Sequence, residues 1–349
     1  MPGFIARRIL PAAALLLVLL MPRFLWCQSG SPRAPSFGVN WNPADISIPF
    51  PQQLIGSLIG AASVGSHLSF FWEWAAATDV YGVATIVVPA ARDLGLQTLI
   101  QIQPTSFAGP SPPPDLAATS FSDPLLRSRY LVDVAKLAVL HPTYINLAPE
   151  INFLYLENRD EFDQFRTLYA EAYAEVKAIS PETKVGVSHH LDLMFGVSQF
   201  ELIELMGPQD YIGFTTYPAY LVYQGYYPSI DQIPASYYTR VRQLTQKPIV
   251  FTEVGWPSGG RGSPQDEADF IGRLPELMAG AQPDLIMWSK ETDSAHLSVA
   301  NLTLQQLVVL AIFQVDVQQL FDELNSTGLL FWDGSPKPAW FTARGLPFR

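Results

Sequence analysis

The stretch at residues 248–257 reads PIVFTEVGWP, an apolar run that ends at a single glutamate, Glu253. Near-continuous apolar runs are typical of parallel strands that are buried on both faces. We therefore expect a buried strand over residues 248–252, with a carboxylate placed immediately after it. A partly buried carboxylate at such a position is costly unless it is paired or has a chemical use.

Seven further runs of the same kind occur along the chain. They start roughly 27 to 48 residues apart, which leaves room for a helix and two loops between successive strands. Together with residues 248–252 they predict strands over residues 37–41, 67–71, 97–103, 144–147, 184–188, 211–215 and 285–288.

Helical patterns fill the gaps between these runs. Residues 161–179 carry an apolar stripe at three- and four-residue spacing, and residues 125–140 and 265–279 have similar patterns. Eight strand-helix units without a change in composition predict an α/β fold, a (β/α)8 TIM barrel in one domain over residues 36–349. An open doubly wound sheet is the alternative, and the lack of a glycine-rich phosphate turn after the first strand argues against it.

The composition limits the function classes. Of the 349 residues, 48% are hydrophobic and 15% are charged, which indicates a sizeable core. The net charge is −11, whereas nucleic-acid-binding proteins usually have a basic surface. The sequence has no phosphate-binding loop, dinucleotide fingerprint or serine nucleophile elbow. We expect no cofactor.

The amino terminus resembles an export signal. Arg7 and Arg8 precede an apolar segment at residues 9–21 that is too short for a membrane span. We expect a signal peptide over residues 1–29, a Ser/Pro-rich linker over 30–35, and a secreted, periplasmic or extracellular protein without a membrane anchor. Lipidation at Cys27, the only cysteine, and an uncleaved anchor are the alternatives.

A second glutamate follows the predicted fourth strand, in the stretch NLAPEIN at residues 146–152. In an α/β barrel the functional residues lie at the carboxyl ends of the strands, so Glu150 and Glu253 are expected at the same mouth. Retaining glycoside hydrolysis requires such a pair, one carboxyl group that protonates the leaving oxygen and one carboxylate that attacks the anomeric carbon. A separation of about 5 to 5.5 Å predicts retention, and one beyond about 6.5 Å predicts inversion.

Three stretches also resemble a known family. TEVGWPS at residues 252–258 resembles the nucleophile strand of clan A glycoside hydrolases, of the β-1,3-glucanase type with some similarity to β-1,4-galactanases. APEIN at 148–152 resembles their acid/base strand, and residues 328–340 resemble their closing segment. The resemblance implies that Glu253 is the nucleophile, that Glu150 is the general acid/base, that Tyr217 orients the nucleophile, and that Trp288 forms a stacking platform for the sugar.

Pro149 departs from the family pattern, in which an asparagine precedes the acid/base and contacts the sugar 2-hydroxyl. Proline has neither a side-chain donor nor a backbone N–H, so Asn146, Asn152 or His189 would have to replace that contact. A metal site at His189 would need further ligands, and only Asp192 is close in sequence, so none is expected.

Other residues at predicted strand ends complete the candidate site. Aromatic faces favour the C–H surfaces of sugars, so tryptophans near the mouth are candidate sugar contacts. The candidate substrate-binding residues are Asn40, Trp41, Trp72, His189, Tyr217, Trp256 and Trp288.

The sequence thus predicts a monomeric, cofactor-free retaining glycosidase that cleaves a β-linked polysaccharide or oligosaccharide by double displacement. A barrel that binds carbohydrate with weakened catalysis and a transglycosylase are the alternatives.

Overall fold

The computed structural model describes residues 34–41, 50–75, 80–106, 108–294 and 316–348. Ala34–Arg349 form one compact unit. The signal peptide and most of the linker lie outside the described residues, so both stay predictions.

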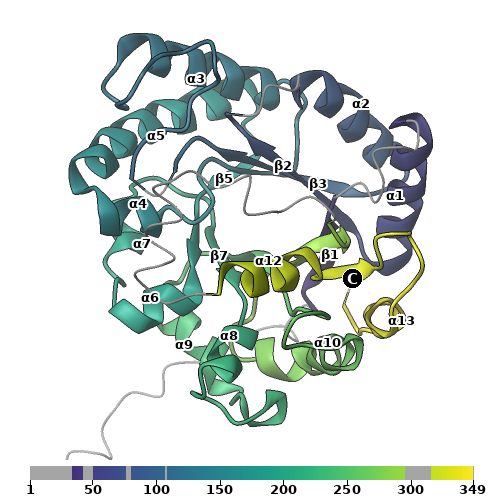
Figure 1. Cartoon of the computed structure of the whole chain (residues 1–349). Coiled ribbons are helices and arrows are strands. Elements are labelled where there is room, and N and C mark those ends of the chain that lie inside the picture. The colour runs from purple at the N-terminus through teal and green to yellow at the C-terminus, as the bar shows by residue number, and fades with distance from the viewer. Residues whose placement is uncertain (1–33, 42–49, 76–79, 107, 295–315, 349) are drawn as a thin grey trace, which may run out of the picture. The chain divides into compact units, whose positions relative to one another are not determined.

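Nine of the described strands form one parallel sheet that closes into a barrel (Figure 1). The neighbours in the sheet run β5-β4-β3-β2-β1-β9-β8-β7-β6, and only Val187 separates β5 from β6 along the chain. These two short strands are therefore one interrupted barrel strand. The barrel then has eight strands, which confirms the predicted (β/α)8 architecture. The strands are β1 Ser36–Asn40, β2 His67–Glu73, β3 Gln97–Gln103, β4 Tyr144–Asn146, β5 Lys184–Gly186, β6 Ser188–His190, β7 Ile212–Thr216, β8 Ile249–Val254 and β9 Leu285–Trp288.

Helices surround the strands (Figure 1) and bury one apolar face each. In the longest, Phe162, Phe165, Tyr169 and Val176 are buried at the predicted spacing, and Asn158 caps the first turn by accepting a hydrogen bond from the Glu161 N–H. The helices are α1 Phe50–Val64, α2 Val80–Asp93, α3 Pro124–Ala138, α4 Asn152–Glu157, α5 Arg159–Ile179, α6 Leu191–Val197, α7 Leu202–Leu205, α8 Ala219–Tyr223, η2 Ile230–Gln232, α9 Ser236–Leu244, α10 Pro264–Met278, α12 Val317–Asn325 and α13 Pro338–Arg344.

Two strand ends differ from the sequence prediction in a way that matters for the site. β8 continues to Val254, so Glu253 lies within the strand rather than after it, and β2 continues to Glu73, so Trp72 lies within it too. After β9 the chain forms β10 (Lys290–Thr292), which pairs in parallel with β11 (Gly328–Leu330) outside the barrel sheet.

The barrel interior is layered. The first layer is an apolar cluster that includes Leu99, Tyr144 and Val250. Next comes a chain of side-chain hydrogen bonds, in which the Gln101 amide donates to Asn40 and Ser69 while the Asn146 amide donates to Gln101 and Ser188. These polar residues follow the apolar ones along their strands, toward the carboxyl end. The floor of the barrel mouth is therefore polar and internally hydrogen-bonded.

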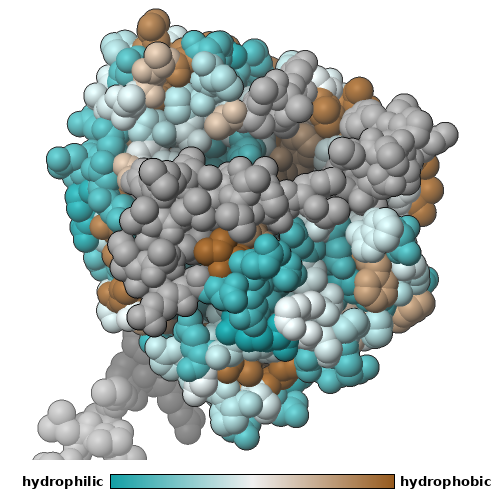
Figure 2. Space-filling model, in the orientation of Figure 1, coloured by the Kyte–Doolittle hydropathy of each residue, from teal (hydrophilic) through white to brown (hydrophobic). Residues whose placement is uncertain are grey.

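Among the described residues that are visible in Figure 2, no extended apolar face is present. Hydrophobic residues there form small separate groups among hydrophilic ones, as is usual for globular proteins. Among the described residues no helix has the length and apolarity needed to cross a bilayer.

Candidate active site

Glu253 points into the barrel because β8 carries an irregularity. Val250 belongs to the apolar cluster inside the barrel, whereas Phe251 belongs to the outer core, which packs between the strands and the helices. Strict alternation along the strand would therefore turn Glu253 outward. The register between β7 and β8 instead shifts after the Phe214–Phe251 pair, so that Thr215 lies opposite Glu253. A bulge of this kind re-aims the side chains that follow it, and here it directs Glu253 inward.

The Glu253 carboxylate accepts a hydrogen bond of 2.7 Å at Oε2 from the Tyr217 hydroxyl. Burial, and secondarily the negative charge of Glu150, raise the pKa of Glu253 to about 7. The Tyr217 hydrogen bond and the positive charge of Lys290 act in the opposite direction. The predicted orienting role of Tyr217 therefore has a matching contact.

Tyr217 is itself held on two sides. Its ring packs against Gly255, where a Cβ atom would lie only 2.4 Å from the ring Cε1, so only glycine fits there. Its backbone N–H donates to Asp192 Oδ2 at 2.7 Å, and the Thr216 hydroxyl donates to Asp192 Oδ1 at 3.0 Å. The Tyr237 hydroxyl also donates to Asp192. The first turn of α6 thus fixes the end of β7, an anchor that sequence reasoning did not find.

Glu150 follows β4 in a backbone conformation that side chains rarely adopt. Its φ is +54°, in the left-handed region that costs a residue with a Cβ roughly 1–2 kcal/mol. Contacts with β6 hold this turn, because the Ile151 N–H donates to the Ser188 carbonyl at 3.1 Å. The Glu150 Oε1 accepts a hydrogen bond of 2.7 Å from the Thr215 hydroxyl.

The two glutamates lie in one site, since Thr215 pairs with Glu253 across the sheet and its hydroxyl donates to Glu150. The raised pKa belongs to the expected nucleophile, although a nucleophile must be ionised. The Glu150 contribution, however, requires Glu150 to be charged. When Glu150 carries the proton needed for acid catalysis, that contribution disappears and Glu253 ionises more readily.

Lys290 is a second residue that sequence reasoning missed. It follows β9, and its ammonium group donates to the Leu324 carbonyl at 2.6 Å. Burial lowers the pKa of Lys290 to about 8, against the opposite effect of Glu253 and Asp293. Its positive charge favours the ionised form of Glu253.

The two histidines at the end of β6 face opposite sides. His189 has no exposed surface and lies beside Phe214, with ring centroids 6.1 Å apart. Burial lowers the pKa of His189 to about 3, so the ring stays neutral. His190 instead lies beside Tyr217, at 6.5 Å between ring centroids. Of the two histidines, His190 is the one near the glutamates. His189 packs away from them, and the substrate contact predicted for it stays a prediction.

The other predicted substrate contacts occupy varied positions. The Asn40 amide belongs to the polar layer and donates to the Thr252 carbonyl at 3.3 Å. Trp41 is partly exposed and stacks on Phe70 at 5.5 Å, whereas Trp72 is buried in the core.

The tryptophans after β8 and in β9 are buried as well. Trp256 and Trp288 are 1% and 0% exposed, and both rings lie against Phe270 at 5.0 and 6.2 Å. The Trp288 indole N–H donates to the Thr327 carbonyl at 2.9 Å. Packing accounts for both positions, and sugar contact by any of these residues stays a prediction.

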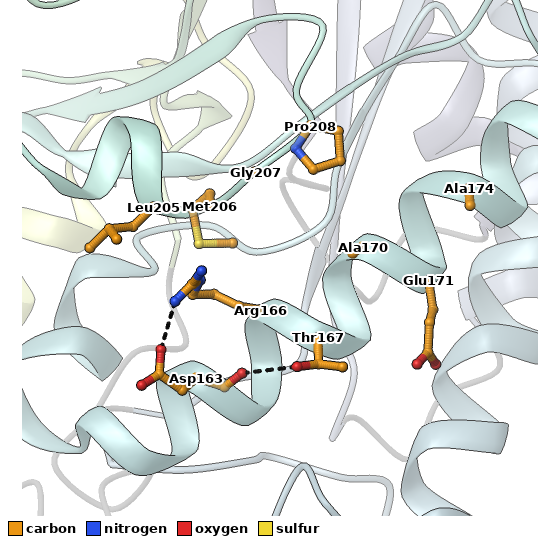
Figure 3. Close-up of a pocket in the computed structure, with 10 residues that line it drawn as sticks. All are labelled: Asp163, Arg166, Thr167, Ala170, Glu171, Ala174, Leu205, Met206, Gly207 and Pro208. Carbon is orange, nitrogen blue, oxygen red and sulfur yellow. Dashed lines mark hydrogen bonds and ion pairs between the residues drawn. The ribbon is translucent and has the colours of Figure 1, made fainter.

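Two further features bear on what the site binds. Within the described ranges, no group of three or more His, Cys, Asp or Glu side chains is arranged to hold a metal ion. A surface pocket of about 810 Å³ lies between α5 and residues 205–208, lined by Asp163, Arg166 and Met206 among others (Figure 3). Neither Glu150 nor Glu253 lines this pocket, so it forms no part of the candidate active site.

Comparison with known proteins places the fold. No protein-family model matches the sequence, and a search of curated proteins found no match either. Among solved structures, GH5_18 from Streptomyces cattleya in complex with GlcNAc aligns with a TM-score of 0.64 at 14% identity, over 90% of this chain and 80% of that one.

Two other solved structures agree with this match. A GH5_18 variant from Bifidobacterium longum subsp. longum in complex with Manβ1-4GlcNAc gives 0.62 at 15% identity, over 89% and 77% of the two chains. An exo-β-1,4-mannosidase from Opitutaceae bacterium strain TAV5 gives 0.62 at 15%, over 91% and 60%. The chain therefore has the barrel fold of clan A glycoside hydrolases, which agrees with the resemblance seen in its motifs. The particular glucanase or galactanase type stays a prediction.

Proposed function

We propose that this protein is a retaining glycoside hydrolase that cleaves a β-linked glycan. The observation that carries the proposal is the pairing of Glu150 and Glu253 at one barrel mouth. Each accepts a hydrogen bond from a hydroxyl group, Glu150 from Thr215 at the end of β7 and Glu253 from Tyr217 directly after β7. Such a pair supplies both an acid and a nucleophile, which is what double displacement needs.

In the first step the Glu253 carboxylate attacks the anomeric carbon while the bond from that carbon to the glycosidic oxygen breaks. The Glu150 proton passes to the departing oxygen, which leaves a covalent ester between the sugar and Glu253. In the second step Glu150 takes a proton from water, the water oxygen attacks the anomeric carbon, and Glu253 leaves as a carboxylate. The Tyr217 hydroxyl keeps its proton and so can donate a hydrogen bond to Glu253, because burial and the charge of Glu253 raise the pKa of Tyr217 well above its usual value.

The sugar is best sought among several β-linked classes. The motifs resemble enzymes of β-1,3-glucans and β-1,4-galactans, while the structures with the same fold include a β-mannosidase and β-glucosidases. A panel of β-glucans, β-galactans, β-mannans and 4-nitrophenyl β-glycosides covers these possibilities.

The test is hydrolysis of that panel by the wild type, Glu253→Gln and Glu150→Gln. We expect turnover of at least one β-glycan by the wild type, first release of the β-anomer in proton NMR spectra, and loss in both variants. Release of the α-anomer would contradict double displacement. Glycan binding without turnover across the whole panel would instead indicate a binding protein, and transfer products at high acceptor concentration would indicate a transglycosylase.

We also propose that the chain is exported and acts as a monomer. The charged and apolar pattern of residues 1–29 supports export. Amino-terminal sequencing of the secreted protein is expected to start near residue 30, and a full-length, cell-associated product would contradict this.

A further inference from the structure

His190 lies in the same row of side chains as the groups that form the site. It pairs with Thr215 on β7, which in turn pairs with Glu253 on β8. Side chains at paired positions of neighbouring strands point to the same face of a sheet. Because the Thr215 hydroxyl reaches Glu150 inside the mouth, His190 also projects into the mouth.

The backbone and ring of His190 are held firmly. Both amide atoms of Asn152 bind its backbone, since Oδ1 accepts from the His190 N–H at 2.8 Å and Nδ2 donates to its carbonyl at 3.2 Å. The ring lies edge-on to Phe153 at 5.7 Å and 6.5 Å from Tyr217. The imidazole therefore has a defined orientation beside the partner of Glu253.

One hydrogen bond also determines which ring nitrogen carries the proton. The Leu193 N–H, in the first turn of α6, donates to His190 Nδ1 at 3.3 Å. A nitrogen that accepts with its lone pair is unprotonated, so the neutral imidazole carries its hydrogen on Nε2. Within the part of the chain that the structure describes, the ring is partly exposed and Nε2 makes no hydrogen bond.

We propose that the Nε2–H of His190 donates a hydrogen bond to a hydroxyl oxygen of the sugar bound beside Glu253, which makes His190 a specificity-determining residue. The inference rests on the proposed function and names one of its substrate contacts. The ligand class is a neutral sugar ring that presents a hydroxyl acceptor at this point.

The positions of the other polar residues favour His190 for this contact. The Asn152 amide is used by the His190 backbone, and the Asn146 amide N–H group is used within the polar layer. His189 faces the outer core beside Phe214. Pro149 offers no donor.

The test combines variants with altered sugars. kcat/KM is measured for the 4-nitrophenyl β-glycoside that the wild type cleaves fastest and for its monodeoxy analogues, with wild type, His190→Ser and His190→Ala. Serine still caps α6, so the pair separates the cap from the sugar contact. With wild type, we expect kcat/KM for one deoxy analogue to be about tenfold or more below that for the parent glycoside, which is the scale of one hydrogen bond. With either variant, we expect kcat/KM for that analogue and for the parent glycoside to be nearly equal. An equal penalty for every analogue in wild type and variants would overturn the proposal.

Two measurements keep this test independent of turnover. Nitrogen-15 NMR of the ring is expected to show the Nε2–H form of His190 in the free protein, and a proton on Nδ1 in a neutral ring would overturn the proposal. If no glycoside is hydrolysed, the proposed function fails, and calorimetric binding of the same glycosides then tests His190 directly. Equal affinity of wild type and His190→Ser would overturn the contact, with His141→Ser, on the surface, as the histidine control.

Discussion

The two glutamates reach the same barrel mouth by different structural means. Glu253 lies within a six-residue strand, and a bulge in that strand turns its side chain inward. Glu150 follows a strand of only three residues and occupies a left-handed backbone conformation held by contacts with β6. One carboxylate is thus positioned by the sheet, and the other by a turn that the sheet supports.

Each glutamate therefore depends on a different set of contacts. Glu253 depends on β7, through Tyr217 and the α6 turn behind it, and on the positive charge of Lys290. Glu150 depends on one hydroxyl and on a strained turn. The contrast fits the chemistry, because a nucleophile must keep a fixed, ionised carboxylate, whereas an acid/base exchanges its proton in each step.

The largest expected effect separates the two roles by leaving group. Glu253→Gln removes the attacking carboxylate, so kcat/KM is expected to fall by at least about a thousandfold for every substrate. Glu150→Gln is expected to cost about 10²–10⁴-fold for glycans, and much less for 2,4-dinitrophenyl glycosides, whose leaving group needs little protonation. Glu157→Gln, an exposed glutamate, is the control. An equal loss of kcat/KM for both kinds of leaving group in Glu150→Gln would contradict the role of Glu150 as the acid.

The two hydroxyl donors provide the next test. Tyr217→Phe removes a hydrogen bond that lowers the pKa of Glu253, so this pKa is expected to rise above about 7. As the pH falls, the variant is therefore expected to lose activity at a higher pH than the wild type does. A hydrogen bond to a charged group is worth about 1.5–3 kcal/mol, so kcat/KM is expected to drop roughly ten- to a hundredfold. Thr215→Val leaves the Tyr217 contact intact and is expected to keep the acid limb near that of the wild type. A pH profile of kcat/KM for both variants decides this, and identical shifts would contradict the separate roles.

A smaller effect is expected behind Tyr217. Asp192→Asn weakens the bonds that anchor the end of β7, and we expect a several-fold loss of kcat/KM with a shift of the acid limb in the direction seen for Tyr217→Phe. Asp210→Asn is the matched control, because Asp210 likewise accepts a strand N–H, from Val185, and a tyrosine hydroxyl, from Tyr173, but holds no part of the site. A pH profile of Asp210→Asn that shifts equally would reduce Asp192 to a general structural role.

The smallest effect on activity, but a clear one on stability, is expected at a third buried carboxyl group. Glu291, in β10, is 1% exposed, and burial raises its pKa to about 8. Because the folded protein favours the protonated form of Glu291, this group stabilises the fold fully at pH values below its pKa in the unfolded chain. As the pH rises from that pKa to about 8, the free energy of unfolding is expected to fall by roughly 1.4 kcal/mol per pH unit. Glu291→Gln is expected to remove this loss in urea unfolding at pH 6 and pH 9, with activity nearly unchanged. An unchanged pH dependence would show that burial is not the cause.

Much of the fold was predictable because it depends on local patterns. The eight apolar runs correspond to the barrel strands, and the three helical stretches lie within one or two residues of α3, α5 and α10. Strand ends were less predictable, since pairing with a neighbour decides where a strand stops. β8 reaches Val254 because β7 continues beside it to Thr216.

The site was predictable only in part. Glu150 and Glu253 were found because each follows an apolar run, and Tyr217 because its motif resembles a family. Asp192, Lys290 and His190 were missed, because their contacts join elements that are distant in sequence and no local pattern marks them. His189 was chosen over His190 because sequence position alone does not tell which of two adjacent residues faces the mouth.

By itself the sequence determined the barrel, since buried apolar runs alternating with amphipathic helices can satisfy their burial in few other ways. It also indicated that two glutamates lie at or shortly after the carboxyl ends of strands of that barrel. Only the tertiary structure decided their orientation. Strict alternation along β8 would have turned Glu253 toward the helices, and the register shift against β7, which is set by pairing between strands, turns it into the mouth.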